Sequence, residues 1–530
     1  MIKKLNLECL EKLLKNRFKE GFLSLKDLPN PSTFKDMDRA TKRIVEAINN
    51  REKITIIGDY DVDGVISTTL MKLFFETLDY PIEWIIPNRF RDGYGLSANI
   101  IPRIIDTDLA VTVDNGISAV YAANLCKEQG IELIITDHHL LAPEIPECYA
   151  IIDQKQEDCT FPYSDVCGAQ IAWYLIASLK NALNIEINLI SYMELVAVAI
   201  IADMMPLQHI NRAMVNAGIQ ALNKSTRPAI RAFLEHMKKE ALGAEDIGFF
   251  LAPLLNSAGR MEDARFAVAF LTSNNIYDAR VRLEHLIDFN NARKAIEQEI
   301  TAKALVQANI DDDVIVVEGK AWHEGVVGIV AARVARYYEK PCIVLSNNGE
   351  GMLKGSGRSF GECDLFSITN SCREYLEKFG GHSAAIGLSL HKNNLESFRK
   401  QLQINYRNSH YTKELVDPDI IGELYFRDIS FELTALIKQY EPYGQGNPTP
   451  KFISKNVEIL QAESMGKEGE HLRFSFSQEG IVMVGVQFKT IQVYEIGSVV
   501  DIVYTLNENY FRGNVTLQLT VEKVIIHETL

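Results

Sequence analysis

The feature that most constrains the fold is a regular alternation of two hydrophobic patterns between residues 53 and 210. Short runs rich in Ile, Val and Leu predict strands at 53–58, 82–86, 109–113, 131–136 and 149–153. Segments with helical periodicity lie between these runs, at 64–78, 117–129 and 168–182. Strands that alternate with helices in this way predict an α/β fold with a parallel, doubly wound sheet.

The remaining parts of the chain have different characters. Residues 1–50 are polar and helical in period and predict an N-terminal helical segment, so that the first α/β domain spans 51–273. Residues 274–309 contain no Gly or Pro and predict one long connecting helix. A second, smaller α/β domain is expected at 310–407, with a helix at 364–378. Short alternating runs in the segment 408–530 predict a closed β-barrel such as an OB-fold.

Composition limits the class of protein. A chain of 530 residues with 47% hydrophobic and 24% charged residues is typical of a soluble protein with several domains. No apolar run approaches a membrane span, so no membrane partner is expected. The eight cysteines form no C-x-x-C pair, and the N-terminal residues lack the apolar core of a signal peptide. These features predict reduced thiols and a cytoplasmic location.

The net charge of −15 is unlike the basic field of most nucleic-acid-binding proteins. It does not exclude such a function, because bound metal ions and local arginines can reverse the sign of the charge at a site.

Carboxylates and histidines follow the predicted strands of the first domain. "GDYDVDG" follows the first strand, "VDNGIS" the third, "TDHH" the fourth and "IIDQK" the fifth, and the apolar run at 195–202 also ends at an aspartate. The residues concerned are Asp59, Asp61, Asp63, Asp114, Asn115, Asp137, His138, His139, Asp153 and Asp203. Because the carboxyl ends of parallel strands face one crevice, these side chains are expected to converge.

Carboxylates this close together repel one another unless something compensates their charge. Two divalent cations would do so, and Asp with imidazole suits Mn²⁺ or Mg²⁺. Two such ions, about 3.5–4 Å apart, support hydrolysis by in-line phosphoryl displacement. Each motif alone is more often a helix N-cap or a surface pair, but their convergence favours a metal site.

Arginines and glycine-rich stretches have the character of phosphate sites. The candidates are Arg89 in "PNRFRDGYG", Arg260 in "NSAGRM", and Ser356 and Arg358 in "GSGRS", which we expect to be a short turn. "WHEGVVGIVAAR" predicts a loop that leads into a helix N-terminus, and "GGH" brings in His382 as a donor. Each glycine motif alone is more often a structural turn.

"GDYDVDG", "VDNGIS" and "TDHH" resemble signature motifs of the DHH phosphoesterase superfamily, and "WHEGVVGIVAAR", "GSGRS" and "GGH" resemble its associated DHHA1 domain. "PNRFRDGYG", "LNSAGRM" and "EPYGQGNPTP" narrow the resemblance to the RecJ family of single-strand-specific 5′→3′ DNA exonucleases. One departure is Ile57, where many superfamily members carry a histidine.

The resemblance implies a site for two Mn²⁺ or Mg²⁺ ions. Its ligands would be Asp61, Asp63, Asp114, His138 and Asp203, with Asp59 and His139 in supporting roles. Asn115 belongs to the third motif and is expected on the substrate side of the site. Arg89, Arg260, Ser356 and Arg358 would hold a 5′-phosphate, and His382 would lie near the scissile group.

The resemblance further implies a single DNA strand, threaded by its 5′ end between two lobes, as substrate. It implies a monomer that acts in DNA repair and recombination alongside a single-strand-binding protein and a helicase. In the barrel, candidates for gripping the strand are Lys451, Phe452, Lys455, Arg473, Phe474, Tyr510, Phe511 and Arg512. Which of these aromatics belong to the barrel core stays open.

Two alternatives differ in substrate or class. A DHH hydrolase of oligoribonucleotides or cyclic dinucleotides would not need the long chain and the barrel. A non-catalytic DNA-binding replication scaffold would not need the intact set of ligands.

Overall fold

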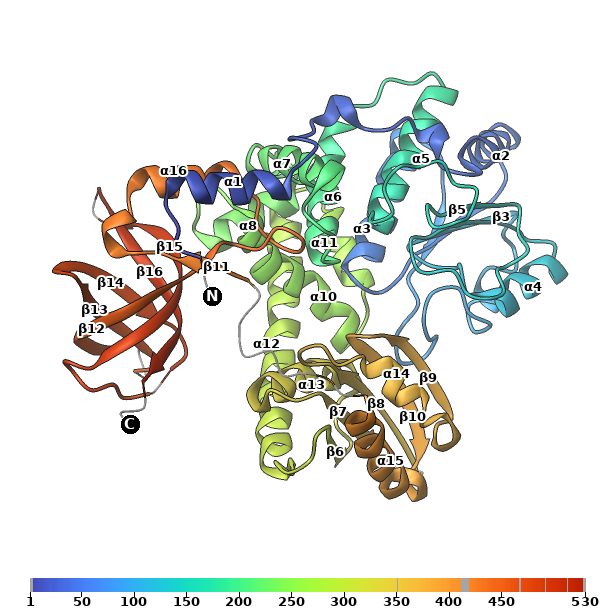
Figure 1. Ribbon diagram of the computed structural model, residues 1–530. Helices are drawn as coiled ribbons and strands as arrows, with labels where there is room; N and C mark the ends of the chain where they lie inside the picture. The colour runs from blue at the N-terminus through green and yellow to red at the C-terminus, as the bar shows by residue number, and fades with distance from the viewer. Residues whose placement is uncertain are drawn as a thin grey trace.

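A five-stranded, wholly parallel sheet in the order β2-β1-β3-β4-β5 forms the centre of the first lobe (Figure 1). The computed structural model describes residues 3–349, 351–409, 411, 419–466, 469–490, 492–511 and 513–527. The strands are β1 (Ile54–Ile57), β2 (Glu83–Ile85), β3 (Leu109–Val113), β4 (Glu132–Thr136) and β5 (Ala150–Ile152). The predicted parallel sheet is therefore confirmed.

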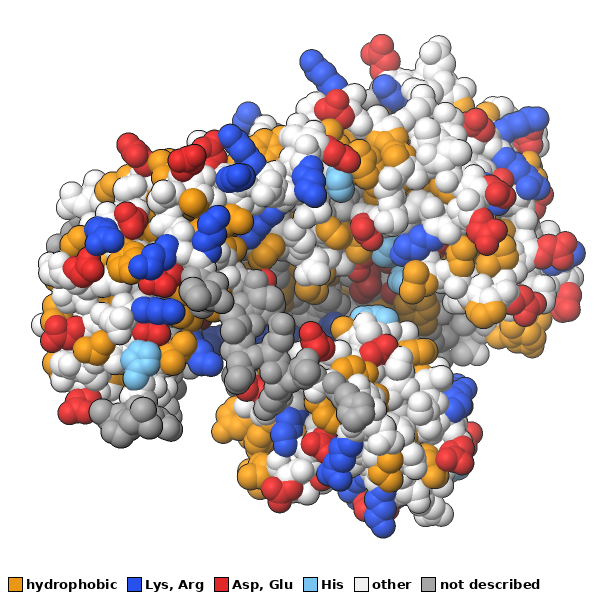
Figure 2. Space-filling view, in the orientation of Figure 1, with side chains coloured by type: hydrophobic (Ala, Val, Ile, Leu, Met, Phe, Trp, Pro, Cys, Tyr) orange, Lys and Arg blue, Asp and Glu red, His pale blue; other side chains and the backbone are white. Residues whose placement is uncertain are grey.

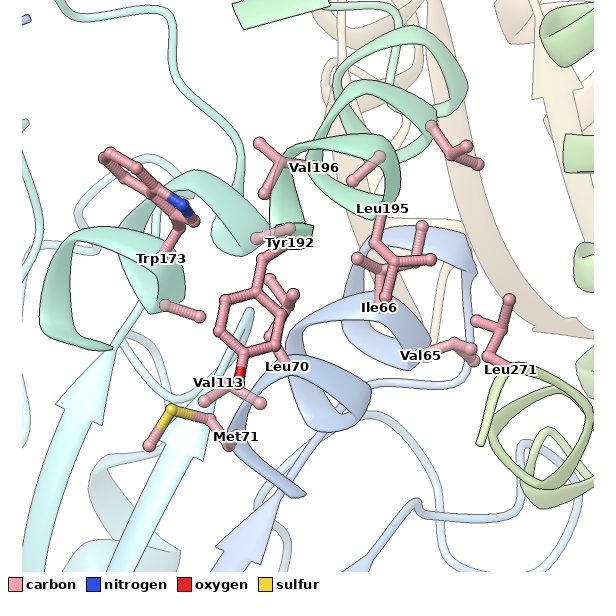
Figure 3. Close-up of a cluster of buried hydrophobic side chains, with 14 of the residues drawn as sticks. Val65, Ile66, Leu70, Met71, Val113, Trp173, Tyr192, Leu195, Val196 and Leu271 are labelled. Carbon is pink, nitrogen blue, oxygen red and sulfur yellow. The ribbon is translucent and has the colours of Figure 1, made fainter. Parts of the chain in front are cut away.

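Both faces of this sheet are buried because its strands are apolar at nearly every position. In β3, Leu109, Val111 and Val113 face one hydrophobic cluster and Ala110 faces another. The first cluster is covered by α2 (Met37–Asn50), α3 (Val62–Thr77), α5 (Gly168–Ala182) and α6 (Ile190–Ala202). Figure 3 shows side chains of α3, α5 and α6 around Val113. The second cluster is covered by α4 (Val120–Glu128) and the segment 96–104.

A helical region completes the first lobe and leads to the second. It comprises α7 (His209–Asn223), α8 (Pro228–Met237), α9 (Ala244–Asp246), η4 (Ile247–Leu251), α10 (Ala252–Met261) and α11 (Arg265–Leu271). The following helix, α12 (Ile276–Gln307), has 32 residues and is about 48 Å long. It joins the two lobes as predicted from the segment 274–309 (Figure 1).

The second lobe has a mixed sheet in the order β6-β7-β8-β10-β9. Its elements are β6 (Ile315–Lys320), α13 (Glu324–Tyr338), β7 (Cys342–Asn347), β8 (Met352–Arg358), α14 (Leu365–Asn370), β9 (Lys378–His382), β10 (Ala385–His391) and α15 (Leu395–Asn408).

Two local expectations for this lobe are wrong. "GSGRS" is not a turn, because Gly355 and Gly357 lie inside β8. A Cβ at Gly355 would come within 2.1 Å of the carbonyl oxygen of Val344, so glycine is needed there for close strand packing. The helix expected at 364–378 ends at Asn370, because the chain then passes through a short 3-10 turn and enters β9.

The C-terminal part is a closed barrel, which confirms the predicted OB-fold. The order is β11-β12-β13-β14-β16-β15, and a further pairing of β12 with β15 closes the sheet. The strands are β11 (Ile420–Glu423), β12 (Lys451–Met465), β13 (His471–Gln478), β14 (Ile481–Gln487), β15 (Val499–Phe511) and β16 (Asn514–Ile526), with α16 (Phe431–Gln439) after β11.

The N-terminal segment is divided between the barrel and the first lobe. In α1 (Leu7–Arg17), Leu10 and Leu14 belong to the hydrophobic core of the barrel, and α1 lies beside α16 in Figure 1. In α2, Met37 and Ile44 belong to the core of the first lobe. We therefore use the name barrel domain for α1 together with the segment 419–527. The domain limits given above stay predictions.

Some of the aromatic residues named above as candidates for gripping the strand belong to the barrel core. Phe452 and Phe474 are fully buried, whereas 67% of Tyr510 is exposed and Arg473 lies on the surface. Lys451 pairs with Glu522 at 3.0 Å. Arg512 and the side chain of Phe511 lie outside the described residues.

In the described ranges, no helix combines the length and the apolarity that a membrane crossing requires.

Candidate metal centre

The turn between β1 and α3 is built so that three aspartates face one side. Asp61 is the N-cap of α3, and its side chain accepts a hydrogen bond from the amide of Gly64 at 3.1 Å. A Cβ at Gly64 would lie 2.5 Å from the backbone nitrogen and oxygen of Asp59, so only glycine permits this turn. Asp59 is buried, and burial together with the charge of Asp61 raises its pKa well above the usual range.

Asp63 is fixed by the first turn of α5. Its Oδ2 accepts a hydrogen bond from the amide of Gly168 at 2.6 Å, and its Oδ1 accepts one from Ala169 at 2.8 Å. The positive end of a helix dipole favours a carboxylate here. Burial and the nearby Asp61 still raise the pKa of Asp63 to about 6.

Asp114 follows β3 in a left-handed conformation, with φ of 63°. It is 1% exposed, and neither of its carboxylate oxygens has a hydrogen-bond partner among the described residues. Burial and the charge of Asp63 raise its pKa well above the usual range. A Cβ at Gly168 would lie 2.5 Å from that of Asp114, so glycine allows α5 to approach this carboxylate.

His138 lies between three carboxylates. Its Nε2 is 3.1 Å from Oδ1 of Asp114 and 3.7 Å from an oxygen of both Asp63 and Asp203. Burial and the neighbouring His139 lower the pKa of His138 to about 3. The imidazole is therefore neutral, which is the form that binds metals.

Asp137 holds the "TDHH" turn in place. One carboxylate oxygen accepts hydrogen bonds from the amide of His138 at 2.8 Å and from Nδ1 of His139 at 2.7 Å, and the other accepts one from the amide of Ile117 at 2.8 Å. Although burial opposes it, the hydrogen bond with Asp137 raises the pKa of His139 to about 9. The motif predicted that Asp137 would lie among the converging side chains, but not that it would hold His138 and His139 in place.

Asp203 reaches the same place from a helix instead of a strand. It is the C-cap of α6, and its Oδ2 has no hydrogen-bond partner among the described residues. Burial and the charge of Asp63 raise its pKa to about 8.

Together these side chains fit two divalent cations. Ligand atoms within 4.8 Å of one another form three overlapping groups, namely Asp59–Asp61–Asp114, Asp63–His138–Asp203 and Asp114–His138–His139. Asp59, Asp114 and Asp203 each have a buried carboxylate oxygen with no hydrogen-bond partner in the part of the chain that the structure describes, and such acceptors need a cation or a donor. Oxygen ligands with one or two imidazoles suit Mn²⁺ or Mg²⁺. All five predicted ligands fall in these groups, and so do Asp59 and His139.

Two other predicted residues lie differently. Asp153 belongs to none of these groups, and its Oδ1 accepts a hydrogen bond from the amide of Lys155 at 2.8 Å. Asn115, predicted on the substrate side, is 0% exposed. Its amide group accepts from Leu96 and donates to the carbonyl oxygens of Ile57 and Val113. Asn115 therefore joins the 88–96 loop to the strand ends, and its place on the substrate side stays a prediction.

The predicted phosphate-binding residues gather where the two lobes meet. The guanidinium of Arg89 lies 4.1 Å from the ring centre of Tyr60. Arg260 donates to the carbonyl oxygen of Gly325 in α13 at 3.2 Å, and burial and Arg89 lower its pKa to about 10.

Arg358 belongs to the same region but to the second lobe. It donates to Oγ of Ser356 at 2.9 Å, and both groups lie 3.2 Å from the position of a Cβ at Gly328 in α13. Figure 2 shows a hollow between the lobes with acidic and histidine atoms inside it. The arrangement places cationic groups around the first turns of α13, which is a suitable environment for an anion.

The second lobe also contains two histidines in motifs that were predicted to contribute to the site. His382 lies in β9 and is exposed, and its Nδ1 accepts a hydrogen bond from the amide of Ala384 at 3.3 Å. Its place near a scissile group stays a prediction. His323, which lies in the motif "WHEGVVGIVAAR" but was not predicted as a site residue, is the N-cap of α13, and its ring lies 5.5 Å from that of Phe90 in the first lobe.

Known proteins are similar to this chain in both lobes and in the barrel. Three family models match, described as "DHH family, N-terminal domain" at 53–200, "DHHA1 domain" at 311–406 and "RecJ OB domain" at 420–523. The single-stranded-DNA-specific exonuclease RecJ of Escherichia coli is 33% identical, over 92% of this chain and 90% of its own length. The RecJ of Bacillus subtilis is 32% identical over 96% of this chain, which spans 66% of that protein, slightly under two thirds of its length.

Solved structures agree. The crystal structure of RecJ from Thermus thermophilus in complex with Mn²⁺ is similar with a TM-score of 0.81 and 25% identity, covering 94% of this chain and 72% of that one. A manganese-bound exonuclease RecJ gives a TM-score of 0.63 and 27% identity, covering 72% of this chain and 96% of that one. The resemblance inferred from the motifs is thereby confirmed, and the chain belongs to the RecJ family.

Proposed function

We propose that this protein is a two-metal-dependent exonuclease that hydrolyses the phosphodiester bonds of single-stranded DNA in the 5′→3′ direction. The observation that carries the proposal is the convergence of buried carboxylates and a neutral histidine at one edge of the sheet, with carboxylate oxygens that lack partners among the described residues. Relatives that are 33% identical over nearly the whole chain are single-stranded-DNA-specific exonucleases.

The metal ligands would be Asp61, Asp63, Asp114, His138 and Asp203, as predicted. Asp114 would be a ligand common to both parts of the centre, since it belongs to two of the three groups and neither of its oxygens has a hydrogen-bond partner among the described residues. Bound Mn²⁺ or Mg²⁺ supplies Lewis-acid chemistry, which activates water and offsets the charge on the phosphate. Asp59 and His139 would support the ligands, with His139 oriented by Asp137.

The chain's own cations would select the phosphate end. Arg89 and Arg260 from the first lobe and Arg358 with Ser356 from the second would bind a 5′-phosphate through charge-assisted hydrogen bonds. A strand that carries this phosphate into the hollow between the lobes would place its first phosphodiester near the carboxylates. His382 would donate near the scissile group.

The barrel domain would hold the following nucleotides. Exposed residues such as Tyr510 and Arg473 suit base stacking and phosphate contact. Binding should therefore weaken with salt despite the acidic total charge. By its family the enzyme would act in DNA repair and recombination in the cytoplasm, as a monomer, alongside a single-strand-binding protein and a helicase.

The test uses a 5′-phosphorylated single-stranded DNA labelled at its 3′ end, incubated with Mn²⁺, Mg²⁺ or EDTA. A duplex and an RNA of the same sequence serve as controls. The proposal expects shortening from the 5′ end, with metal and on the single DNA strand alone. Cleavage of only short RNA or cyclic dinucleotides would indicate a small-substrate hydrolase, and binding without cleavage would indicate a scaffold.

A further inference from the structure

The loop that follows Asp203 is in direct contact with the barrel domain. This loop, residues 204–208, joins the C-cap of α6 to α7. The amide of Leu207 donates to the carbonyl oxygen of Gln445 at 2.7 Å, and the side-chain amide of Gln208 donates to the carbonyl oxygen of Gly446 at 2.6 Å. These contacts join segments that are more than 230 residues apart in sequence.

The barrel side of this contact is a tight turn within "EPYGQGNPTP". Gly444 and Asn447 exchange backbone hydrogen bonds of 2.9 and 3.2 Å, and the side-chain amide of Asn447 donates to the carbonyl oxygens of Tyr440 and Pro442. Gly446 has φ of 70°, and a Cβ there would lie 2.9 Å from that of Pro206. The two segments therefore pack so closely that a single methyl group must displace one of them.

A second link runs from the same loop to Asp63. The side-chain amide of Asn211 donates to the carbonyl oxygen of Pro206 at 3.0 Å, and its Oδ1 accepts from the side chain of Gln170 at 2.9 Å. Gln170 lies in the first turn of α5, whose amides hold the carboxylate of Asp63. Loop 204–208 is therefore linked to two members of the group Asp63–His138–Asp203. It follows Asp203 directly in the chain, and it is connected to the helix turn that holds Asp63 through Asn211 and Gln170.

The position of Asp203 depends on its backbone. Its Oδ2 has no hydrogen-bond partner among the described residues, and the next residue, Met204, has a left-handed conformation with φ of 54°. Arg212 adds to the contact by donating to the carbonyl oxygen of Glu441 at 2.6 Å. A shift of the barrel turn would therefore be transmitted to the backbone next to Asp203.

We propose that the barrel turn Gly444–Asn447 is a positioning element for the metal centre, acting through loop 204–208 on Asp203. The inference rests on the proposed function for the identity of the site. It assigns to the barrel domain a role in metal binding besides any grip on DNA. Groups that support metal ligands typically contribute about 10- to 100-fold to metal affinity.

The test compares two glycine substitutions, both at positions with a left-handed backbone conformation. Gly446→Ala introduces the methyl group against Pro206, whereas Gly480→Ala is a matched control in the same barrel, with φ of 82° and nothing within 4 Å of its Cβ. Mn²⁺ binding to the metal-free full chain is measured by the EPR signal of free Mn²⁺. Gly446→Ala should weaken the binding of at least one Mn²⁺ about tenfold, and Gly480→Ala should leave it unchanged.

Gln208→Ala removes only a side-chain hydrogen bond and keeps the proposal testable if Gly446→Ala does not fold. It should also weaken Mn²⁺ binding, and excess Mn²⁺ should restore exonuclease activity in both variants. Wild-type Mn²⁺ affinity in the folded variants, with or without a loss of DNA binding, would overturn the inference. A wild-type chain that binds Mn²⁺ but cleaves no single-stranded DNA would instead overturn the proposed function.

Discussion

Asp203 should make the metal-free protein less stable as the pH rises. Burial and the charge of Asp63 raise its folded pKa to about 8 from the ordinary value of 3.8, and 27% of its side chain is exposed. Below both pKa values the carboxyl group is protonated in both states. Between them the folded state binds more protons than the unfolded state, so the free energy of unfolding falls as the pH rises.

The size of the effect follows from the pH interval. Between about pH 6.5 and 8, a slope of about 1.4 kcal/mol per pH unit gives a loss of about 2 kcal/mol from Asp203 alone. For a domain the size of the first lobe, this corresponds to a fall in Tm of about 4–8 °C. His139, with its pKa raised to about 9, acts in the same direction. His138, with its folded pKa lowered from 6.5 to about 3, acts weakly in the opposite direction, and only near pH 6.5, where the unfolded form still binds protons.

The assay is thermal unfolding of the full chain in EDTA at about pH 6.5, 7.5 and 8.5, repeated with Mn²⁺. Mn²⁺ should reduce the slope, because a cation replaces the protons that the carboxylates would otherwise bind. Asp203→Asn cannot ionise, so in EDTA it should unfold several degrees above the wild type at the highest pH. A Tm that stays constant or rises with pH in EDTA, or equal slopes for wild type and variant, would refute the reasoning.

Three other substitutions test separate parts of the site. Asp114→Asn should lower single-turnover cleavage more than about a hundredfold while binding of single-stranded DNA, measured by fluorescence anisotropy, is kept, and a variant with full activity would contradict the shared-ligand role. Arg358→Ala should lower the kcat/KM preference for a 5′-phosphate over a 5′-hydroxyl end about tenfold, and an unchanged preference would remove Arg358 from the phosphate site. Asn115→Ala removes a hydrogen-bond partner from three backbone groups and should lower the free energy of unfolding by about 3 kcal/mol in urea titrations. A stable Asn115→Ala variant with weak DNA binding would instead support the substrate-binding role.

The sheet and the metal centre could be predicted because their causes are local in sequence. A strand covered on both faces must be apolar at nearly every position, and β3 is buried throughout. The parallel connections then bring the residues after each strand to one edge, which is why Asp63, Asp114 and His138 meet. Charge repulsion between such residues indicated cations before any distance was known.

Features that depend on tertiary partners were not predictable from the same patterns. Asn115 follows β3 directly after Asp114, but its side-chain amide binds Leu96 of the 88–96 loop and the strand carbonyl oxygens of Ile57 and Val113. Gly355 was predicted to lie in a turn, but it lies in a strand. Glycine is needed there because Val344 on β7 leaves no space for a side chain. The helical periodicity of α1 predicts an apolar face, but it cannot predict that the barrel covers this face.

The ligands of the centre differ in how the fold orients them. Asp63 is held by two amides at a helix N-terminus, and His138 lies in a turn fixed by Asp137. Among the described residues, no hydrogen-bond donor supports Oδ1 or Oδ2 of Asp114 or Oδ2 of Asp203, and burial together with the charge of Asp63 raises the pKa of both carboxyls. The backbone must then do much to set where these carboxylates lie. A Cβ at Gly168 would meet Asp114 directly, so this glycine fixes the approach of α5 to that carboxylate. Gly446 packs instead against Pro206, three residues after Asp203, and its influence on Asp203 is the proposal that Gly446→Ala tests.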